Sequence, residues 1–244
     1  MAAGNNGRSC VTQSPKPGFG YPGGRCCPHA RVTEPALRYS IYMQILPATE
    51  ESITEALRIL KEGGVIAHAT ETCYGLACDL RNPDAVQKLF AIKKRSPDQP
   101  VSALFSSIDD AKKYLEWSKE ADALAAKYLP GPLTIILPMK ADAPHQLFPV
   151  PALAPALTLG LRLSSLPLAM NLVTRFGSPI STTSANIHGE PSPYSATEIF
   201  ERFTKEADQP DLILDSGELP QVKPSTVINL TDGTTLRSGD IALS

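Results

Sequence analysis

Hydroxyl side chains gather at residues 181–186, where the sequence reads STTSAN. They follow a short apolar stretch typical of a buried strand, and a strand that ends in so many hydroxyl groups is expected to hydrogen-bond something. Turns rich in hydroxyls, glycine or proline also lie beside other apolar stretches, at 69–76, 130–134 and 223–226. Hydroxyls and backbone N–H groups at several strand ends indicate a pocket for a polar ligand.

Four isolated cations lie near these turns: Lys93, Arg95, Arg162 and Arg237. Cations combined with hydroxyls are the groups that a nucleoside triphosphate needs. Arg162 is the most informative, because it interrupts the apolar run LGLRL and a buried guanidinium needs an anionic partner. For Lys93 and Arg95 the alternative is a solvated helix C-terminus whose charges complement the helix dipole.

Three common phosphate-binding and catalytic motifs are absent from the sequence: the P-loop, G-x-S-x-G and H-E-x-x-H. Ser184 is a candidate nucleophile, but no histidine has a sequence context that marks it as the base. His68 lies in a strand pattern, which favours a packed residue over a catalyst. The spacing of Thr70 and Thr72 alone favours simple turn residues.

Helical and strand patterns alternate along the chain, so we predict an α/β fold. Apolar spacing and end signals predict helices over 53–60, from 83, from about 108, and over 118–128, 167–176 and 196–205. Short apolar runs predict strands at 65–69, 101–105, 133–137, 158–163, 179–185, 212–214 and 225–230. Residues 140–157 lack any period and predict a surface loop.

The chain has 244 residues, 42% of them hydrophobic, and a formal net charge of −2. This charge gives no general attraction to nucleic acids or acidic membranes. We find no apolar run of membrane-spanning length and no signal-peptide pattern, so the expectation is a cytoplasmic protein without a membrane partner. The five cysteines are an odd number and argue against a disulfide framework, and no metal site is predicted from them.

Residues 1–42 differ from the rest of the chain. They are rich in glycine, proline, serine and arginine and show no sustained apolar period. We predict a disordered N-terminal extension over 1–42, followed by a single domain over 43–244.

Six motifs occur in a fixed order: ATETCYGLACD, KKRSPDQPV, LPGPLTIIL, GLRL, STTSANIHGEPSP, and KPSTVINL followed by LRSG. Together they resemble the threonylcarbamoyl-AMP synthase family, the YrdC, Sua5 and TsaC proteins, in its short single-domain form. The resemblance extends over residues 45–241. It implies a YrdC-like α/β fold, in which a twisted mixed sheet flanked by helices surrounds a deep basic cavity.

The resemblance also implies an activity. Members are nucleotidyltransferases that condense L-threonine, bicarbonate or CO₂, and ATP into L-threonylcarbamoyladenylate and pyrophosphate. A separate tRNA threonylcarbamoyl-transferase complex then modifies adenosine 37 of tRNA, so that complex is the expected downstream partner, together with a weak tRNA contact. Mg²⁺ would accompany ATP, with phosphates and water as most of its ligands.

The resemblance assigns roles to particular residues. Lys93 and Arg95 would be the catalytic cations that hold the triphosphate. L-Threonine would contact Thr72, Arg162, Thr182 and Ser225, with Arg162 on its carboxylate. ATP would contact Lys93, Arg95, Gln99, Ser184, Asn186, Ser192 and Arg237.

Five positions depart from the family pattern. Ala69 replaces a usual proline, Gln99 stands where asparagine, lysine or serine is common, and Leu104 stands where many members have histidine. Ser164 and Leu166 occupy a segment where the pattern R-x-P-x-H is common. Apart from the mild change at Ala69, these departures touch the expected substrate pockets, and they indicate a shifted affinity or a paralogous branch.

Other functions remain open from the sequence. One is an RNA- or nucleotide-binding paralog without synthase activity, although the net charge and the lack of interleaved aromatic residues weigh against RNA binding. Another is a relative that makes a different carbamoyl-adenylate, as in hydrogenase maturation. Such relatives carry zinc-finger and transferase domains, and the sequence shows neither.

Overall fold

The computed structural model describes residues 43–96, 101–143 and 157–241, all of which lie in the unit 40–244. The extension predicted at 1–42 lies outside the described residues, as do Gln99 and most of the loop predicted at 140–157.

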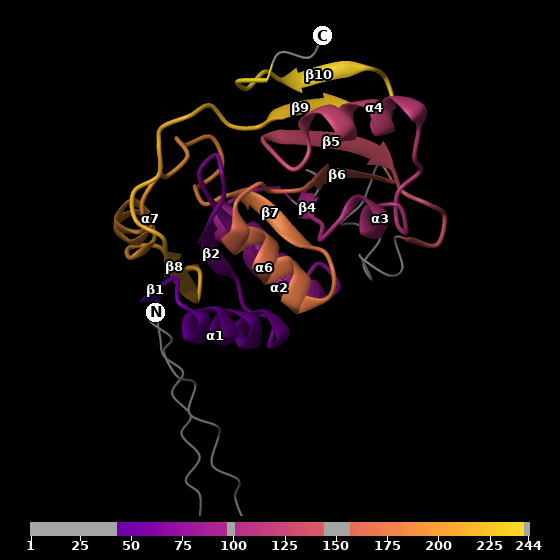
Figure 1. Ribbon diagram of the computed structural model, residues 1–244. Helices are drawn as coiled ribbons and strands as arrows, with labels where there is room; N and C mark the ends of the chain where they lie inside the picture. Colours follow the sequence, from indigo (N-terminus) through magenta and orange to yellow (C-terminus); the bar gives the residue numbers. More distant parts are fainter. Residues whose placement is uncertain (1–42, 97–100, 144–156, 242–244) are drawn as a thin grey trace, which may run out of the picture. The chain divides into compact units, whose positions relative to one another are not determined.

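The described residues form an α/β structure (Figure 1). Its strands are β1 (Gln44–Pro47), β2 (Ile66–Ala69), β3 (Tyr74–Ala77), β4 (Ser102–Leu104), β5 (Leu133–Pro138), β6 (Thr158–Arg162), β7 (Ile180–Ser184), β8 (Leu212–Asp215), β9 (Thr226–Asn229) and β10 (Thr234–Arg237). Its helices are α1 (Glu50–Lys61), α2 (Pro83–Lys93), α3 (Ile108–Ala111), α4 (Lys119–Tyr128), α6 (Pro167–Phe176) and α7 (Ala196–Phe203).

The strands form one mixed sheet in the order β1-β8-β2-β3-β7-β4-β6-β5-β9-β10. The pairs β1–β8, β2–β8, β4–β6 and β5–β9 are parallel. The other neighbouring pairs are antiparallel. The predicted twisted mixed α/β sheet is therefore confirmed.

Alternate side chains of the strands pack into separate cores on the two faces of the sheet. On one side, here called the first face, Ile66, Leu212 and Leu214 pack with residues of α1 and α6. On the opposite side, the second face, Ala67 and Ile213 pack with residues of α2 and α7. Helices α1 and α6 also contact each other, and they lie close together in Figure 1.

The ends of α2 place Lys93 at a fixed position. Asn82 begins the helix, because its Oδ1 accepts hydrogen bonds from the N–H groups of Asp84 and Ala85 at 3.0 and 3.3 Å. Lys94 ends it in the left-handed conformation, with φ of 47°. Lys93 is consequently the last helical residue, followed closely by Arg95.

All the predicted helices and strands have counterparts in the structure, but β1, β3 and β10 were not predicted. The segment of β3 lies within 69–76, which the sequence predicts as a turn rich in hydroxyls and glycine, and a glycine usually weakens a strand. A Cβ atom at Gly75 would lie only 3.2 Å from the carbonyl oxygen of Thr183 on β7, so the absence of a side chain permits close pairing. Strand β1 has four residues, ends in proline and lies at the sheet edge.

Candidate functional site

A cavity of about 250 Å³ opens on the first face of the sheet. Its lining contains three arginines, and the described lining residues include no carboxylate. The lining residues are Thr72, Cys73, Arg95, Ser102, Thr134, Ile136, Arg162, Thr182, Thr183, Ser184, Pro224, Ser225, Val227, Leu236 and Arg237.

Strand register explains why these residues meet. Thr182 of β7 is paired with Ser102 of β4, Ser102 with Gly160 of β6, and Gly160 with Ile136 of β5. Paired residues point to the same face, so this row forms part of the cavity wall. A Cβ atom at Gly160 would lie 2.5 Å from Ser102 Oγ and 3.2 Å from Thr134 Cγ2. Gly160 therefore leaves room for the polar side chains on both of its neighbouring strands.

The turn between β2 and β3 presents Thr72 to the cavity. Thr70 Oγ1 donates to the carbonyl oxygen of Cys73 at 2.7 Å and accepts from the Thr72 N–H at 3.3 Å. Thr70 is thus the turn-forming residue that the spacing favoured. Thr72 is 2% exposed and lines the cavity, so it is placed where a ligand can meet its hydroxyl.

Arg162 is buried and has the anionic partner that its place in an apolar strand required. Its NH2 donates to Glu71 Oε1 at 2.8 Å and to Thr72 Oγ1 at 2.7 Å. Ser164 Oγ donates to the other oxygen of Glu71. The Nε atom of Arg162 is buried and has no hydrogen-bond partner among the described residues. The described residues therefore satisfy the guanidinium only in part, and Arg162 also lines the cavity.

Glu71 was not predicted as a site residue. Burial raises the pKa of its carboxyl, but the charge of Arg162 and the hydrogen bonds from Ser164 and Arg162 outweigh burial and lower the pKa below its ordinary value. Only the three-dimensional structure reveals that Glu71 meets the strand that carries Arg162 and the residue Ser164 beyond it.

His68 is fully buried on β2. Its Nδ1 donates to the carbonyl oxygen of Ala69 at 2.9 Å, while Nε2 has no partner among the described residues. Burial, with a smaller contribution from the charge of Arg162, lowers the pKa of His68 to about 4. The ring is therefore neutral at pH 7, and the interpretation as a packed residue is confirmed.

Lys93 lies behind the turn that follows β7. Its ammonium donates to the carbonyl oxygens of Ser184 and Asn186 at 2.6 and 2.9 Å and to Asn186 Oδ1 at 3.1 Å. The side chain is buried and does not line the cavity. The alternative of a solvated helix C-terminus is therefore wrong for Lys93. Burial, with a contribution from the charge of Arg95, lowers the pKa of Lys93 to about 7.

The same turn orders two further predicted residues. Ser184 Oγ donates to Asn186 Oδ1 at 2.6 Å, and Asn186 Nδ2 donates to the carbonyl oxygen of Glu190. Ser184 lines the cavity, and Asn186 is buried behind it. Burial raises the pKa of the cavity residue Cys73, and a hydrogen bond with Ser192 partly opposes this rise. Ser192 therefore lies beside the cavity wall.

Arg237 of β10 is held against Ser225. Its Nε and NH2 donate to the carbonyl oxygen and the hydroxyl of Ser225 at 2.8 and 2.9 Å. Ser225 Oγ also lies 3.0 Å from Thr134 Oγ1 on β5. Partial burial lowers the pKa of Arg237 and of Arg95 from their ordinary values. These two arginines and Arg162 together make the cavity electropositive.

The sequence itself matches a known family. Residues 58–239 match the Sua5, YciO and YrdC proteins, a family described as "Telomere recombination". This stretch makes up most of the chain. The chain belongs to the Sua5/YciO/YrdC family.

Members of the Sua5/YciO/YrdC family with similar sequences come from bacteria and archaea. A putative threonylcarbamoyl-AMP synthase of Methanocaldococcus jannaschii is 31% identical over 194 residues, which cover 78% of this chain and 87% of the relative. The threonylcarbamoyl-AMP synthase of Bacillus subtilis is 36% identical over 160 residues, which cover 63% of this chain and 44% of the relative. The chain thus spans less than half of one relative and most of the other.

The fold of this Sua5/YciO/YrdC chain also matches a solved structure. The crystal structure of P. abyssi Sua5 complexed with L-threonine superposes with a TM-score of 0.71 at 32% sequence identity. The match covers 82% of this chain and 57% of that chain. The resemblance recognised in the sequence motifs is therefore confirmed, as is the YrdC-like fold.

The structure brings most of the predicted site residues of this Sua5/YciO/YrdC chain together. Seven of them line the cavity: Thr72, Arg95, Arg162, Thr182, Ser184, Ser225 and Arg237. Lys93, Asn186 and Ser192 lie behind or beside its wall, and Gln99 lies outside the described residues. Ser102 and Thr134 were not predicted, although both belong to the strands that the sequence indicated.

The departures from the family pattern have different structural consequences. Ala69 and Leu104 are fully buried in the cores of the second and the first face, respectively. Ser164 is also fully buried, but its hydroxyl belongs to the cluster formed by Glu71 and Arg162. The change at Ser164 is therefore the one with a direct link to the cavity.

Among the described residues, no group of three or more histidine, cysteine, aspartate or glutamate side chains is arranged to hold a metal ion. In the described part of the chain, no helix combines the length and apolar character needed to cross a membrane.

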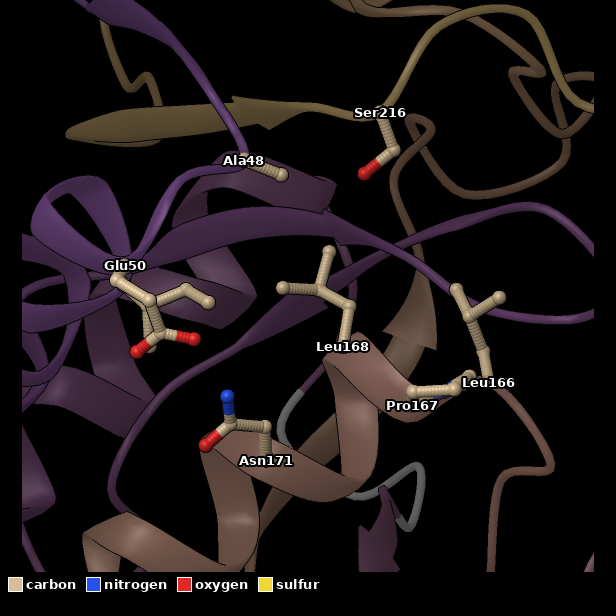
Figure 2. Close-up of a pocket in the computed structure, with 8 residues that line it drawn as sticks. Ala48, Glu50, Leu166, Pro167, Leu168, Asn171 and Ser216 are labelled. Carbon is tan, nitrogen blue, oxygen red and sulfur yellow. The ribbon is translucent and has the colours of Figure 1, made fainter.

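A second hollow, of about 350 Å³, has a different character (Figure 2). Figure 2 shows its side chains coming from the start of α1, the start of α6 and the segment after β8. Its lining is largely apolar and holds one charged group, Glu50, which pairs with Arg175 at 2.9 Å. This hollow offers no cation for a phosphate or a carboxylate, so it is a poor candidate for the functional site.

Proposed function

We propose that this protein is an L-threonylcarbamoyladenylate synthase. The observation that carries the proposal is the convergence of seven residues, expected from separate motifs, on one cavity with three arginines. Family membership and the synthase names of relatives support the same activity. The substrates would be L-threonine, bicarbonate or CO₂, and ATP, and the enzyme would be a nucleotidyltransferase.

The threonine carboxylate would bind Arg162. Arg162 lines the cavity, and a guanidinium forms charge-assisted hydrogen bonds with a carboxylate. The hydroxyls of Thr72, Thr182 and Ser225 line the same cavity and can bond the amine or hydroxyl of threonine. The P. abyssi structure with L-threonine supports this choice of amino acid.

The phosphates of ATP would bind between Arg95 and Arg237, with Ser184 on the cavity wall between the two substrates. Gln99 and Ser192 remain predicted ATP contacts. Lys93 and Asn186 would act on ATP from behind the wall, because the Lys93 ammonium fixes the turn that carries Ser184. Mg²⁺ bound by the phosphates would supply further neutralisation of their charge.

The reaction needs no protein nucleophile. The threonine amine adds CO₂ to form a carbamate and loses a proton. A carbamate oxygen then attacks the α-phosphorus of ATP, and the bond to the β-phosphate oxygen breaks to release pyrophosphate. The arginines would place the two anionic substrates in contact and neutralise the developing charge, which would otherwise keep them apart. A separate tRNA threonylcarbamoyl-transferase complex would consume the product.

The test is threonine-dependent release of pyrophosphate by the full chain with ATP, Mg²⁺ and bicarbonate. A pocket that bonds the substrate hydroxyl should strongly reject valine, which has the shape of threonine without the hydroxyl. Serine keeps the hydroxyl but lacks the methyl group, so it should be used less than threonine. Mass spectrometry of the adenylate product identifies the amino acid used. ATP binding without pyrophosphate release for any amino acid would instead favour a nucleotide-binding paralog.

A further inference from the structure

Glu71 is a buried carboxylate without a role in the proposed reaction. Its side chain is 12% exposed, and its two oxygens accept hydrogen bonds from Arg162 and Ser164. The same NH2 of Arg162 also donates to Thr72 Oγ1 at 2.7 Å. The guanidinium is therefore fastened at one nitrogen by two neighbouring side chains of the β2–β3 turn.

Ser164 connects this cluster to the start of α6. Its oxygen accepts a hydrogen bond from the Leu166 N–H at 3.1 Å, directly before Pro167 begins the helix. Leu166 and Pro167 are seen at this helix start in Figure 2. The hydroxyl has one proton, which goes to Glu71, and its lone pairs take the backbone N–H. Through Ser164, the Glu71 carboxylate is thus connected to the start of helix α6.

We propose that Glu71 and Ser164 are positioning residues that orient the Arg162 guanidinium for capture of the substrate carboxylate. The identity of that carboxylate, L-threonine, rests on the proposed function. Glu71 and Thr72 hold NH2 in place, and Arg162 lines the cavity, so the guanidinium faces the substrate in a fixed orientation. A carboxylate is bound best by a planar guanidinium whose orientation is already fixed.

The cluster contains one hydroxyl, that of Ser164, that is not needed to neutralise the buried charge of Arg162. A carboxylate beside Arg162 would balance its charge in any orientation, with no need for a hydroxyl on the other oxygen. Ser164 restricts the rotation of that carboxylate, so it acts on the direction of the guanidinium rather than on its charge. Positioning and charge balance therefore predict different effects when the Ser164 hydroxyl is removed.

The first variant is Ser164→Ala in the full chain, studied by calorimetric titration with L-threonine and, separately, with ATP. We expect threonine to bind about 3- to 10-fold more weakly, as for the loss of one hydrogen bond in a charged cluster, and ATP affinity to stay within about two-fold of wild type. Ser118→Ala is the matched control, because Ser118 accepts from the Ala121 N–H at 3.1 Å at the start of α4, away from the cavity. It should lower the melting temperature similarly and leave threonine affinity unchanged.

A second variant, Glu71→Asp, keeps the charge but shortens the reach to Arg162 and Ser164 by one methylene group. Positioning predicts weaker threonine binding with unchanged ATP binding, whereas charge balance alone predicts wild-type affinity. The proposal is overturned if both variants bind threonine within about two-fold of wild type, or if both ligands weaken equally. A wild-type protein that binds ATP but no L-threonine would overturn the proposed function as well.

Discussion

Lys93 and Arg162 are two buried cations beside one cavity, and their N–H groups are used in opposite ways. The Lys93 ammonium donates to three neutral oxygens of the turn after β7, which uses all its donors. Arg162 faces a full carboxylate, that of Glu71, yet its Nε is buried without a partner among the described residues. Lys93 therefore has all its hydrogen bonds but no anionic partner. Arg162 has an anionic partner but lacks one hydrogen bond among the described residues.

This difference separates structural from ligand-binding cations. A buried donor without a partner costs free energy, so a cation with such a donor beside a cavity is a candidate for ligand binding. A cation whose donors all bond the protein contributes mainly by fixing the local backbone and by its charge. We therefore propose a ligand contact for Arg162 and support of the turn for Lys93.

The largest expected effect is on stability, from Arg162→Met. The substitution leaves the Glu71 carboxylate buried without its cation, which costs roughly 3–5 kcal/mol of unfolding free energy. The double variant Arg162→Met with Glu71→Gln should recover part of this loss, because the unpaired charge is gone. Urea unfolding of the single and double variants measures both values.

Arg58 provides the control for this prediction. It pairs with Glu55 and Glu62 on the surface of α1, and its side chain is 53% exposed. Arg58→Met should therefore change stability by less than about 1 kcal/mol. If Arg162→Met is as mild as Arg58→Met, the Glu71–Arg162 pair does not have the importance assigned to it.

A pH effect tests a third buried group, His68, whose Nε2 also lacks a partner among the described residues. Its pKa is about 4 in the folded protein and 6.5 in the ordinary state, so between these values the unfolded chain binds more protons. Stability should therefore fall as the pH drops from 6.5 to 4, by about 3 kcal/mol from this group. Below pH 4 its contribution should level off.

Urea unfolding at several pH values measures this slope, and His68→Asn should reduce it. His188 is exposed and provides the control, since His188→Gln removes a histidine without removing a buried ring. A slope that is equal in wild type and His68→Asn would show that burial does not lower the pKa of this ring.

The sequence was sufficient for the helices and most strands, since these depend on local apolar periods and end signals. It did not reveal β3, because a glycine in a four-residue strand indicates a turn until the neighbouring strand β7 is known. The same reason applies to Glu71. Its role depends on contact with residues about 90 positions away, and neither spacing nor composition reports such a contact. Arg162 was predictable because a charge in an apolar strand is itself a signal.

Arg95→Ala extends the comparison to a cation on the cavity wall. It should weaken ATP binding by about 1.5–3 kcal/mol, or roughly 10- to 100-fold, through the loss of charge-assisted hydrogen bonds to phosphate. Lys94→Ala is the adjacent control, because Lys94 is exposed and pairs with Glu206 at 2.7 Å. Calorimetric titration should show near-normal ATP affinity for Lys94→Ala. Equal affinities for the two variants would contradict the phosphate contact of Arg95.

The smallest expected effect concerns the preference of Lys93→Met for ATP over AMP. If Lys93 acts by holding the turn that carries Ser184 and Asn186, its loss should weaken both nucleotides together, and their affinity ratio should change by less than about two-fold. Direct contact with the β- or γ-phosphate, as the sequence predicted, would instead reduce the ratio strongly, because AMP lacks those phosphates. Arg95→Ala is the reference, since it should lower the ratio by about ten-fold or more. A Lys93→Met variant that behaves like Arg95→Ala would show that the Lys93 ammonium leaves the oxygens of Ser184 and Asn186 to contact the nucleotide. A full set of hydrogen bonds within the protein would then not distinguish a structural cation from a ligand-binding one at this site.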